Sequence, residues 1–131
     1  NNFNLILNQT LNFPDMTNIN LRNTSCNLVE KINVFSMTKL QFIDLSHNLF
    51  CENVINRLKF DHLTSLQEIH LVNTNLNLRL KLRNNTKISL IDLSDNKLNY
   101  SNLIEKSEVY YAKNLYLKNT GLEKLDENFN L

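Results

Sequence analysis

The fold is decided by the stretch Leu40-Gln41-Phe42-Ile43-Asp44-Leu45-Ser46-His47-Asn48-Leu49-Phe50, which returns as Ile88-Ser89-Leu90-Ile91-Asp92-Leu93-Ser94-Asp95-Asn96-Lys97-Leu98. Both stretches carry apolar residues at positions one, four, six and eleven and asparagine at position nine. Three further copies begin at Met16, Leu66 and Ala112 and carry threonine at position nine. An internal repeat of this kind outweighs any single local motif as an indicator of architecture.

The spacing within each copy predicts a short strand. Positions four and six are two residues apart, so both side chains point to one face, while positions three, five and seven point to the other. One copy cannot bury its apolar face alone, but stacked copies can. At position nine, Asn48 and Asn96 turn the chain, and a buried amide there satisfies backbone groups that no strand pairing reaches. Threonine has a smaller side chain and predicts turns that are less completely bonded.

This pattern resembles the leucine-rich repeat family, whose consensus is LxxLxLxxNxL at periods of about 20 to 29 residues. Repeat starts at 16, 40, 66, 88 and 112 give lengths of 24, 26, 22 and 24 residues. The resemblance implies an α/β solenoid, a right-handed superhelix or horseshoe arc with a parallel β-sheet on its concave face. We expect one domain over 1–131, with repeats at 16–39, 40–65, 66–87, 88–111 and an incomplete repeat at 112–131. We expect residues 1–15 to form an N-terminal cap in which Phe3 to Leu7 is a strand. The alternative is that they form a degenerate repeat.

The return segments are expected to mix short helices with extended chain on the convex side. Phe35, Phe60 and Phe129 fall where the animal-type class of the family often keeps a core phenylalanine. Asn102-Leu103-Ile104-Glu105 is typical of a capping box and predicts a short helix. The alternation of apolar and polar residues from Leu76 to Arg83 predicts an extended segment instead.

Charge and hydropathy limit the partners. Lysine and arginine number 14 against 13 acidic residues, so a net charge of +1 gives no global reason to expect nucleic acid or an anionic membrane. The local basic cluster Arg79, Lys81, Arg83 and Lys87 lacks a binding motif and is interpreted as a solvated convex face. The apolar stretches are shorter than the roughly 18 residues that span a bilayer. We predict a soluble segment, and its start at Asn1 indicates a processed product or a piece of a longer chain.

Two features bear on the compartment. Cys26 and Cys51 occupy positions eleven and twelve of adjacent repeats, roughly 5 Å apart by strand spacing, so they form either a disulfide or two free thiols. Candidate N-glycosylation sequons begin at Asn8, Asn23, Asn84 and Asn99. Asparagine fills 25 of 131 positions, so such sequons also arise by chance.

The concave face is the candidate binding surface, because family members mostly bind through it and the core does not need its side chains. The candidate binding residues are Phe42, Asp44, His47, Glu68, His70, Val72, Leu90, Asp92, Asp95, Tyr116 and Lys118. Stacking of Asp44, His70 and Asp92 suits a metal or a pH-sensitive contact, but aspartate at position five is also common in this family. We therefore predict no metal and no cofactor. A single glycine excludes a glycine-rich phosphate loop, and no catalytic motif is present.

Together these observations predict non-enzymatic recognition of another protein. The resemblance is greatest to segments of secreted or receptor-type innate-immune proteins, which implies an extracellular or cell-surface location. An intracellular adaptor or scaffold with free cysteines, of a parasite or large-virus type, is the alternative. Oligomer formation through the ends of the stack or through flanking regions stays open.

Overall fold

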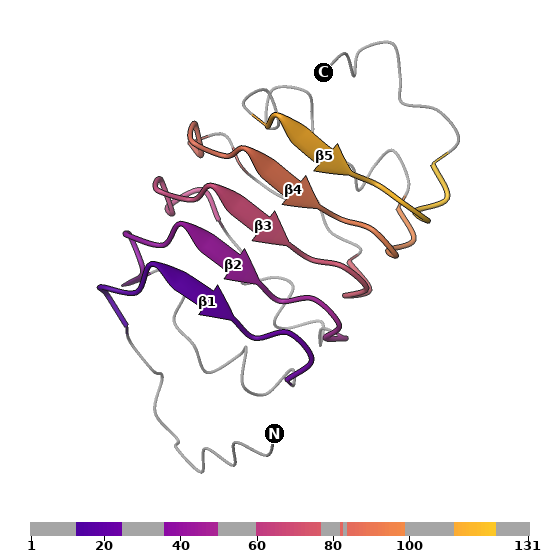
Figure 1. Cartoon of the computed structure of the whole chain (residues 1–131), viewed down its shortest axis with the longest axis horizontal. Helices are drawn as coiled ribbons and strands as arrows, with labels where there is room; N and C mark the ends of the chain where they lie inside the picture. Colours follow the sequence, from indigo (N-terminus) through magenta and orange to yellow (C-terminus); the bar gives the residue numbers. More distant parts are fainter. Residues whose placement is uncertain are drawn as a thin grey trace.

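The computed structural model describes residues 13–24, 36–49, 60–76, 82, 84–98 and 112–122. In these ranges the chain forms one five-stranded parallel sheet whose strands lie side by side in sequence order (Figure 1). Each strand spans three residues at repeat positions three to five. The strands are β1 (Asn18–Asn20), β2 (Phe42–Asp44), β3 (Glu68–His70), β4 (Leu90–Asp92) and β5 (Asn114–Tyr116).

Neighbouring strands pair in a single register, in which equal repeat positions face one another. Ile43 of β2 lies between Ile19 of β1 and Ile69 of β3, and Ile91 and Leu115 continue the same row. A slip of one residue would turn this row outward, so burial of the row specifies the register. The predicted parallel strand in each repeat is therefore confirmed.

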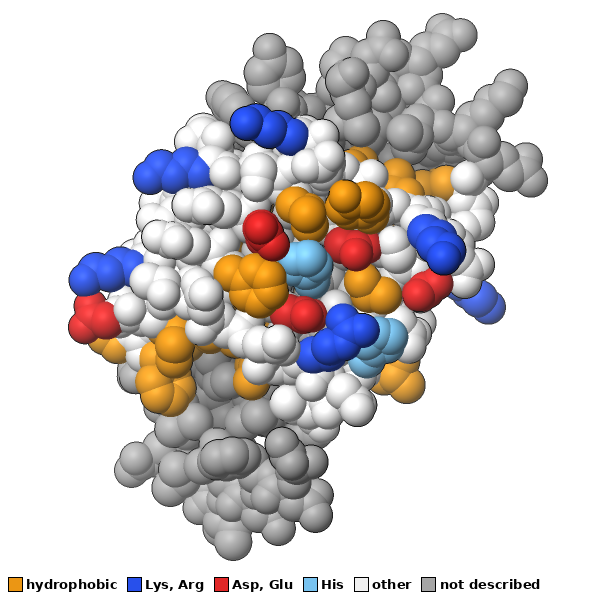
Figure 2. Space-filling model, in the orientation of Figure 1, with side chains coloured by type: hydrophobic (Ala, Val, Ile, Leu, Met, Phe, Trp, Pro, Cys, Tyr) orange, Lys and Arg blue, Asp and Glu red, His pale blue; other side chains and the backbone are white. Residues whose placement is uncertain are grey.

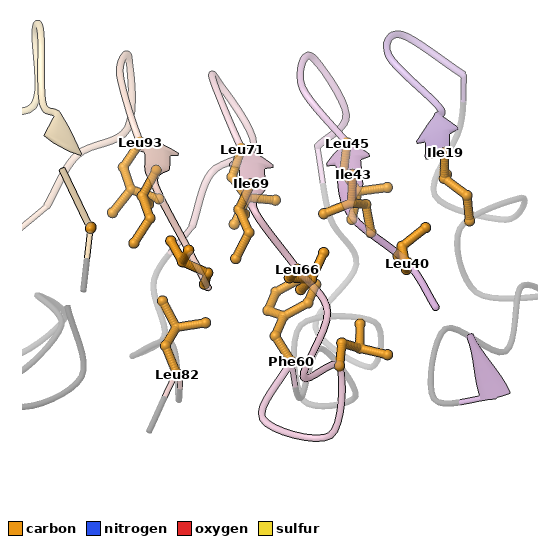
Figure 3. Packing of buried hydrophobic residues seen from close by; sticks show 14 of the residues in the cluster. Ile19, Leu40, Ile43, Leu45, Phe60, Leu66, Ile69, Leu71, Leu82 and Leu93 are labelled. Atoms are coloured by element: carbon orange, nitrogen blue, oxygen red, sulfur yellow. The ribbon is translucent and has the colours of Figure 1, made fainter. Parts of the chain in front are cut away.

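The core lies behind the sheet, on the face to which position four points. Ile43, Ile69 and Ile91 are fully buried, and residues at positions one and six extend the cluster above and below them. Figure 3 shows Phe60 and Leu82 approaching the same cluster from the segments that return behind the strands. Burial of each such side chain contributes about 1.5–3 kcal/mol. The predicted core phenylalanine is thus found at Phe60.

A tight turn precedes each of the first four strands. The N–H at position one donates to the carbonyl oxygen three residues earlier, as between Leu66 and Leu63 at 3.1 Å. Asn85 replaces the apolar residue of this turn before β4. It is buried, and its amide donates to the carbonyl oxygens of Phe60 at 2.9 Å and Leu63 at 2.7 Å. A second asparagine bridge, which the repeat pattern did not predict, therefore ties neighbouring repeats at the opposite end of the strands.

Asn96 closes the turn after β4 and also the turn of the preceding repeat. Its Oδ1 accepts the N–H groups of Thr74 at 3.0 Å and Leu76 at 3.1 Å. Its amide nitrogen donates to the carbonyl oxygens of Leu71 at 2.7 Å and Leu93 at 2.9 Å. Because Asn96 is 1% exposed, these backbone groups have little access to water.

Asparagine and threonine alternate at position nine, and each asparagine bonds back to a threonine. Asn48 accepts the N–H of Thr24 at 3.0 Å and donates to the carbonyl oxygen of Leu21 at 2.8 Å. The hydroxyl of Thr24 donates to the same carbonyl oxygen. The expectation of a less completely bonded turn is therefore wrong at Thr24, because Asn48 of the following repeat supplies the acceptor that the threonine side chain lacks.

Position eight is held in the left-handed backbone region in all five repeats. The φ angles lie between 51° and 58°, at Asn23, His47, Asn73, Asp95 and Asn119. Asparagine, aspartate and histidine enter this region more readily than other residues that carry a Cβ. Backbone geometry therefore accounts for the residue types of this column, and for part of the unusual asparagine content.

Several expectations lie outside the described residues. These are the strand at Phe3 to Leu7, the helix beginning near Asn102, the cysteines Cys26 and Cys51, and the phenylalanines Phe35 and Phe129. The extended segment from Leu76 to Arg83 is described only at Leu76 and Leu82, which are both buried. In the described ranges, no helix is long and apolar enough to cross a bilayer.

We expect Asn96→Ala to lower the free energy of unfolding by about 3 kcal/mol, because buried N–H and carbonyl groups of two repeats lose their partner. Urea denaturation followed by circular dichroism measures this loss. Asn114→Ala removes an exposed amide from β5 and serves as the control, with a change within about 0.5 kcal/mol. A loss below about 1 kcal/mol for Asn96→Ala would mean that water replaces the amide without cost.

Candidate functional site

The sheet presents a face opposite to the core, here named the open face and made by positions three, five, seven and eight of the repeats. Figure 2 views this face and shows acidic, histidine and hydrophobic side chains gathered over its middle, with lysine and arginine mainly around them. All the binding residues predicted from the sequence lie at these positions. They are Phe42, Asp44, His47, Glu68, His70, Val72, Leu90, Asp92, Asp95, Tyr116 and Lys118.

His70 occupies the centre of the open face. Its Nε2 lies 3.1 Å from Oε2 of Glu68, and its ring packs against that of Phe42 with centroids 5.2 Å apart at 43°. On the neighbouring strands, Asp44 and Asp92 are its register partners. The structure thus brings together an aromatic ring, a histidine and three carboxylates from β2, β3 and β4.

The aspartates at position five have a structural task that the sequence analysis did not assign. Oδ1 of Asp44 accepts the N–H of Ser46 at 2.8 Å, and Oδ1 of Asp92 accepts that of Ser94 at 3.0 Å. Asn20 makes the same bond in β1. A side-chain oxygen that accepts the N–H two residues later forms an Asx turn. The spacing of Asn or Asp two residues before each turn is a signal by which this role could have been found.

His70 breaks this rule, because it stands where β1, β2 and β4 have Asn or Asp. The N–H of Val72, two residues later, instead donates to the hydroxyl of Ser46 on the neighbouring repeat at 3.1 Å. Ser46 therefore replaces the side chain of His70 as the acceptor in this turn. The side chain of His70 contacts Glu68 and Phe42 instead. A residue that departs from a local rule while the structure compensates for it is a candidate for function.

Arg22 joins two residues at one margin of the open face, and the sequence analysis did not select it as a site residue. Its Nη2 lies 2.8 Å from Nε2 of His47, and its Nη1 lies 3.8 Å from Oδ2 of Asp44. Asp44 is 7% exposed, so its contact with Arg22 is mainly structural and little of its carboxylate is accessible to a partner. At the opposite margin, Asn119 donates to Asp95 at 3.1 Å.

The contacts of His47 specify its tautomer. Arginine can only donate hydrogen bonds, so Nε2 of His47 accepts from Arg22 and the ring proton lies on Nδ1. Nδ1 lies 3.4 Å from Nδ2 of Asn73, and two donors cannot bond each other, so this second contact is not a hydrogen bond in that tautomer. The bond from Arg22 to His47 therefore links the first two repeats at this margin.

Apolar side chains of the open face differ in how far they reach solvent. Phe42, Val72 and Leu90 are partly exposed, whereas Tyr116 is 49% exposed. None of these side chains belongs to the core cluster. Leu49, which directly follows Asn48, is 70% exposed and was not predicted as a candidate.

An exposed ion pair between Lys39 and Asp15 links the turns that precede β1 and β2, at 2.7 Å. The hydrogen bond to Lys39, aided by its positive charge, lowers the pKa of Asp15, and the reciprocal contact raises the pKa of Lys39. A carboxyl group with a lowered pKa stabilises the fold at neutral pH, and this contribution disappears as the pH falls through that pKa. Full exposure keeps the contribution small.

The other candidate sites have the following positions. In the described part of the chain, no three histidine, cysteine, aspartate or glutamate side chains are grouped so that they could hold a metal ion. The sequon asparagines Asn23 and Asn84 are exposed. Asn8 and Asn99 lie outside the described residues, as do Arg79, Lys81 and Arg83, whereas Lys87 is exposed.

We expect ¹⁵N-resolved NMR at neutral pH to find His47 with its proton on Nδ1, because Arg22 must donate to Nε2. Arg22→Gln is the test variant, since its amide can donate or accept and no longer imposes one tautomer. His62, exposed and in a different turn, provides the comparison ring. A wild-type spectrum with the proton of His47 on Nε2 would contradict the assignment.

Comparison with protein-family models, with curated proteins and with solved structures finds no match for this chain. Inferences about its function therefore depend on the repeat pattern and on the geometry of the open face.

Proposed function

We propose that this chain is part of a leucine-rich repeat solenoid that binds another protein through the open face of its sheet. In this proposal the face is concave, and the sheet curves as a right-handed arc. The parallel order from β1 to β5 supports it, because each return segment must then pass behind the sheet before the next strand. Phe60 and Leu82, buried on that side, are consistent with such a path.

The observation that carries the binding role is the set of apolar side chains on the open face that the core does not use. Tyr116 is about half exposed, and Phe42 packs on His70 instead of joining the core cluster. Aromatic residues on an exposed face, with polar groups around them, are the usual anchors of protein interfaces. No catalytic role follows from the contacts of these residues.

Peptide selection on the immobilised full chain tests the binding role. We expect most peptides selected from a displayed library of random dodecapeptides to lose affinity by about 1–4 kcal/mol on Tyr116→Ala or Phe42→Ala, because truncation of an anchor removes its contact area. Thr38→Ala, an exposed change in the turn before β2, is the control and is expected to leave binding unchanged. Equal binding to wild type and to both alanine variants would move the interface away from the open face.

An extracellular or cell-surface location is part of this proposal, and the exposure of Asn23 and Asn84 agrees with attachment of glycans there. The alternative is an intracellular adaptor or scaffold with free cysteines. The two locations predict different chemical states of the cysteines, which are paired or free, and of the sequon asparagines, which are glycosylated or unmodified.

Mass spectrometry of the native protein without reduction distinguishes the two locations. In the secretory route we expect a linkage between Cys26 and Cys51 or glycans at Asn8, Asn23, Asn84 or Asn99. Denatured protein treated with a thiol-alkylating reagent, with and without prior reduction, is the control for the cysteines. Two alkylated cysteines together with unmodified asparagines would favour the intracellular alternative.

A further inference from the structure

The centre of the open face is negative, although the chain as a whole carries a net charge of +1. Positions three and five of the five repeats comprise ten residues, all of them described. Three of these carry carboxylates, namely Asp44, Glu68 and Asp92, and none is lysine or arginine. The imbalance is therefore local to the surface on which the proposed partner would rest.

The three carboxylates differ in their exposure and in the contacts that they already make. Asp44 is nearly buried and faces Arg22, and Glu68 contacts His70. Oδ1 of Asp92 accepts the N–H of Ser94, while its carboxylate forms no ion pair with any lysine or arginine in the described ranges. Asp92 is also partly exposed. Of the three, it is the carboxylate for which no contact with another side chain is found in the described ranges.

The register places Tyr116 of β5 directly beside Asp92 of β4. Tyr116 is 49% exposed, and Leu90 lies on the same face of β4 as Asp92. A planar guanidinium bonds a carboxylate through two parallel N–H groups and also stacks on an aromatic ring, whereas an ammonium does neither as well. Carboxylate, ring and apolar neighbour are thus complementary to an arginine side chain.

We propose that the open face receives an arginine side chain of its protein partner between Asp92 and Tyr116. This inference rests on the proposed function and specifies the chemistry of the partner segment. The guanidinium bonds the carboxylate of Asp92 and lies against the ring of Tyr116, and adjacent apolar side chains of the partner contact Leu90. Positive charge on the partner complements the negative centre visible in Figure 2.

The test begins with peptides from the displayed dodecapeptide library that bind wild type and are lost on Tyr116→Ala. We expect arginine to be enriched in this group over its frequency in the unselected library, with lysine enriched less. The tightest binder is then synthesised as selected and with its shared arginine changed to glutamine. The dissociation constants of both peptides are measured for wild type and for Asp92→Asn by isothermal titration calorimetry.

Asp92→Asn is a matched substitution, because Asn20 forms the same turn with an amide oxygen in β1. We expect it to weaken the arginine peptide on the order of 10-fold and to leave the glutamine peptide within about 2-fold. Asp15→Asn also removes one carboxylate charge, but it lies in the exposed turn before β1 and outside the open face, so it is the control with unchanged affinity.

The failures of the two proposals are distinguishable. If peptides depend on Tyr116 but lack arginine, or if Asp92→Asn weakens both synthetic peptides equally, the arginine site is wrong while binding by the open face stands. If no selected peptide depends on Tyr116 or Phe42, both proposals are overturned. Circular dichroism of each variant confirms that the sheet is retained.

Discussion

Burial of one row of side chains in register is the constraint on which the rest of this structure depends. A strand of three residues has too few hydrogen bonds and too little apolar surface to persist alone. Ile43 is fully buried because Ile19 and Ile69 are its register partners on either side and because it packs in the same core cluster as Phe60. Once this row is aligned, all other repeat positions fall into columns. The columns then determine which polar groups meet and which side chains face solvent.

Short strands leave many backbone groups at their ends, and the molecule satisfies them with side chains. Asn or Asp at position five closes the first turn, a left-handed residue at position eight redirects the chain, and asparagine at position nine bonds two repeats at once. At the other end of the strands, the amide of Asn85 donates to the carbonyl oxygens of Phe60 and Leu63 in the preceding repeat. The abundance of asparagine therefore has a structural component, because its side chain both donates and accepts and tolerates positive φ.

Side chains of the open face that neither close turns nor belong to the core are the ones available for recognition. One oxygen of Asp44 and one of Asp92 are committed to turns, and the backbone favours His47 at its position. His70 and Tyr116 are not of the turn-forming type found at position five elsewhere, and neither belongs to the core. The chemical character of the open face is consequently set by β3, β4 and β5 more than by β1. The most distinctive feature of this surface is the ring of Tyr116 beside Asp92, whose carboxylate pairs with no lysine or arginine among the described residues.

The sequence alone determined the positions of the five strands and which of their side chains point inward, because both follow from a local period of two residues within a longer repeat. It also placed every candidate binding residue on one face. Only the tertiary structure decided that Asn48 bonds back to Thr24, that Ser46 completes the turn of Val72 and that Arg22 specifies the tautomer of His47. These contacts join residues on neighbouring repeats, separated by more than twenty positions. Their partners are therefore set by the register between strands, which no local pattern encodes.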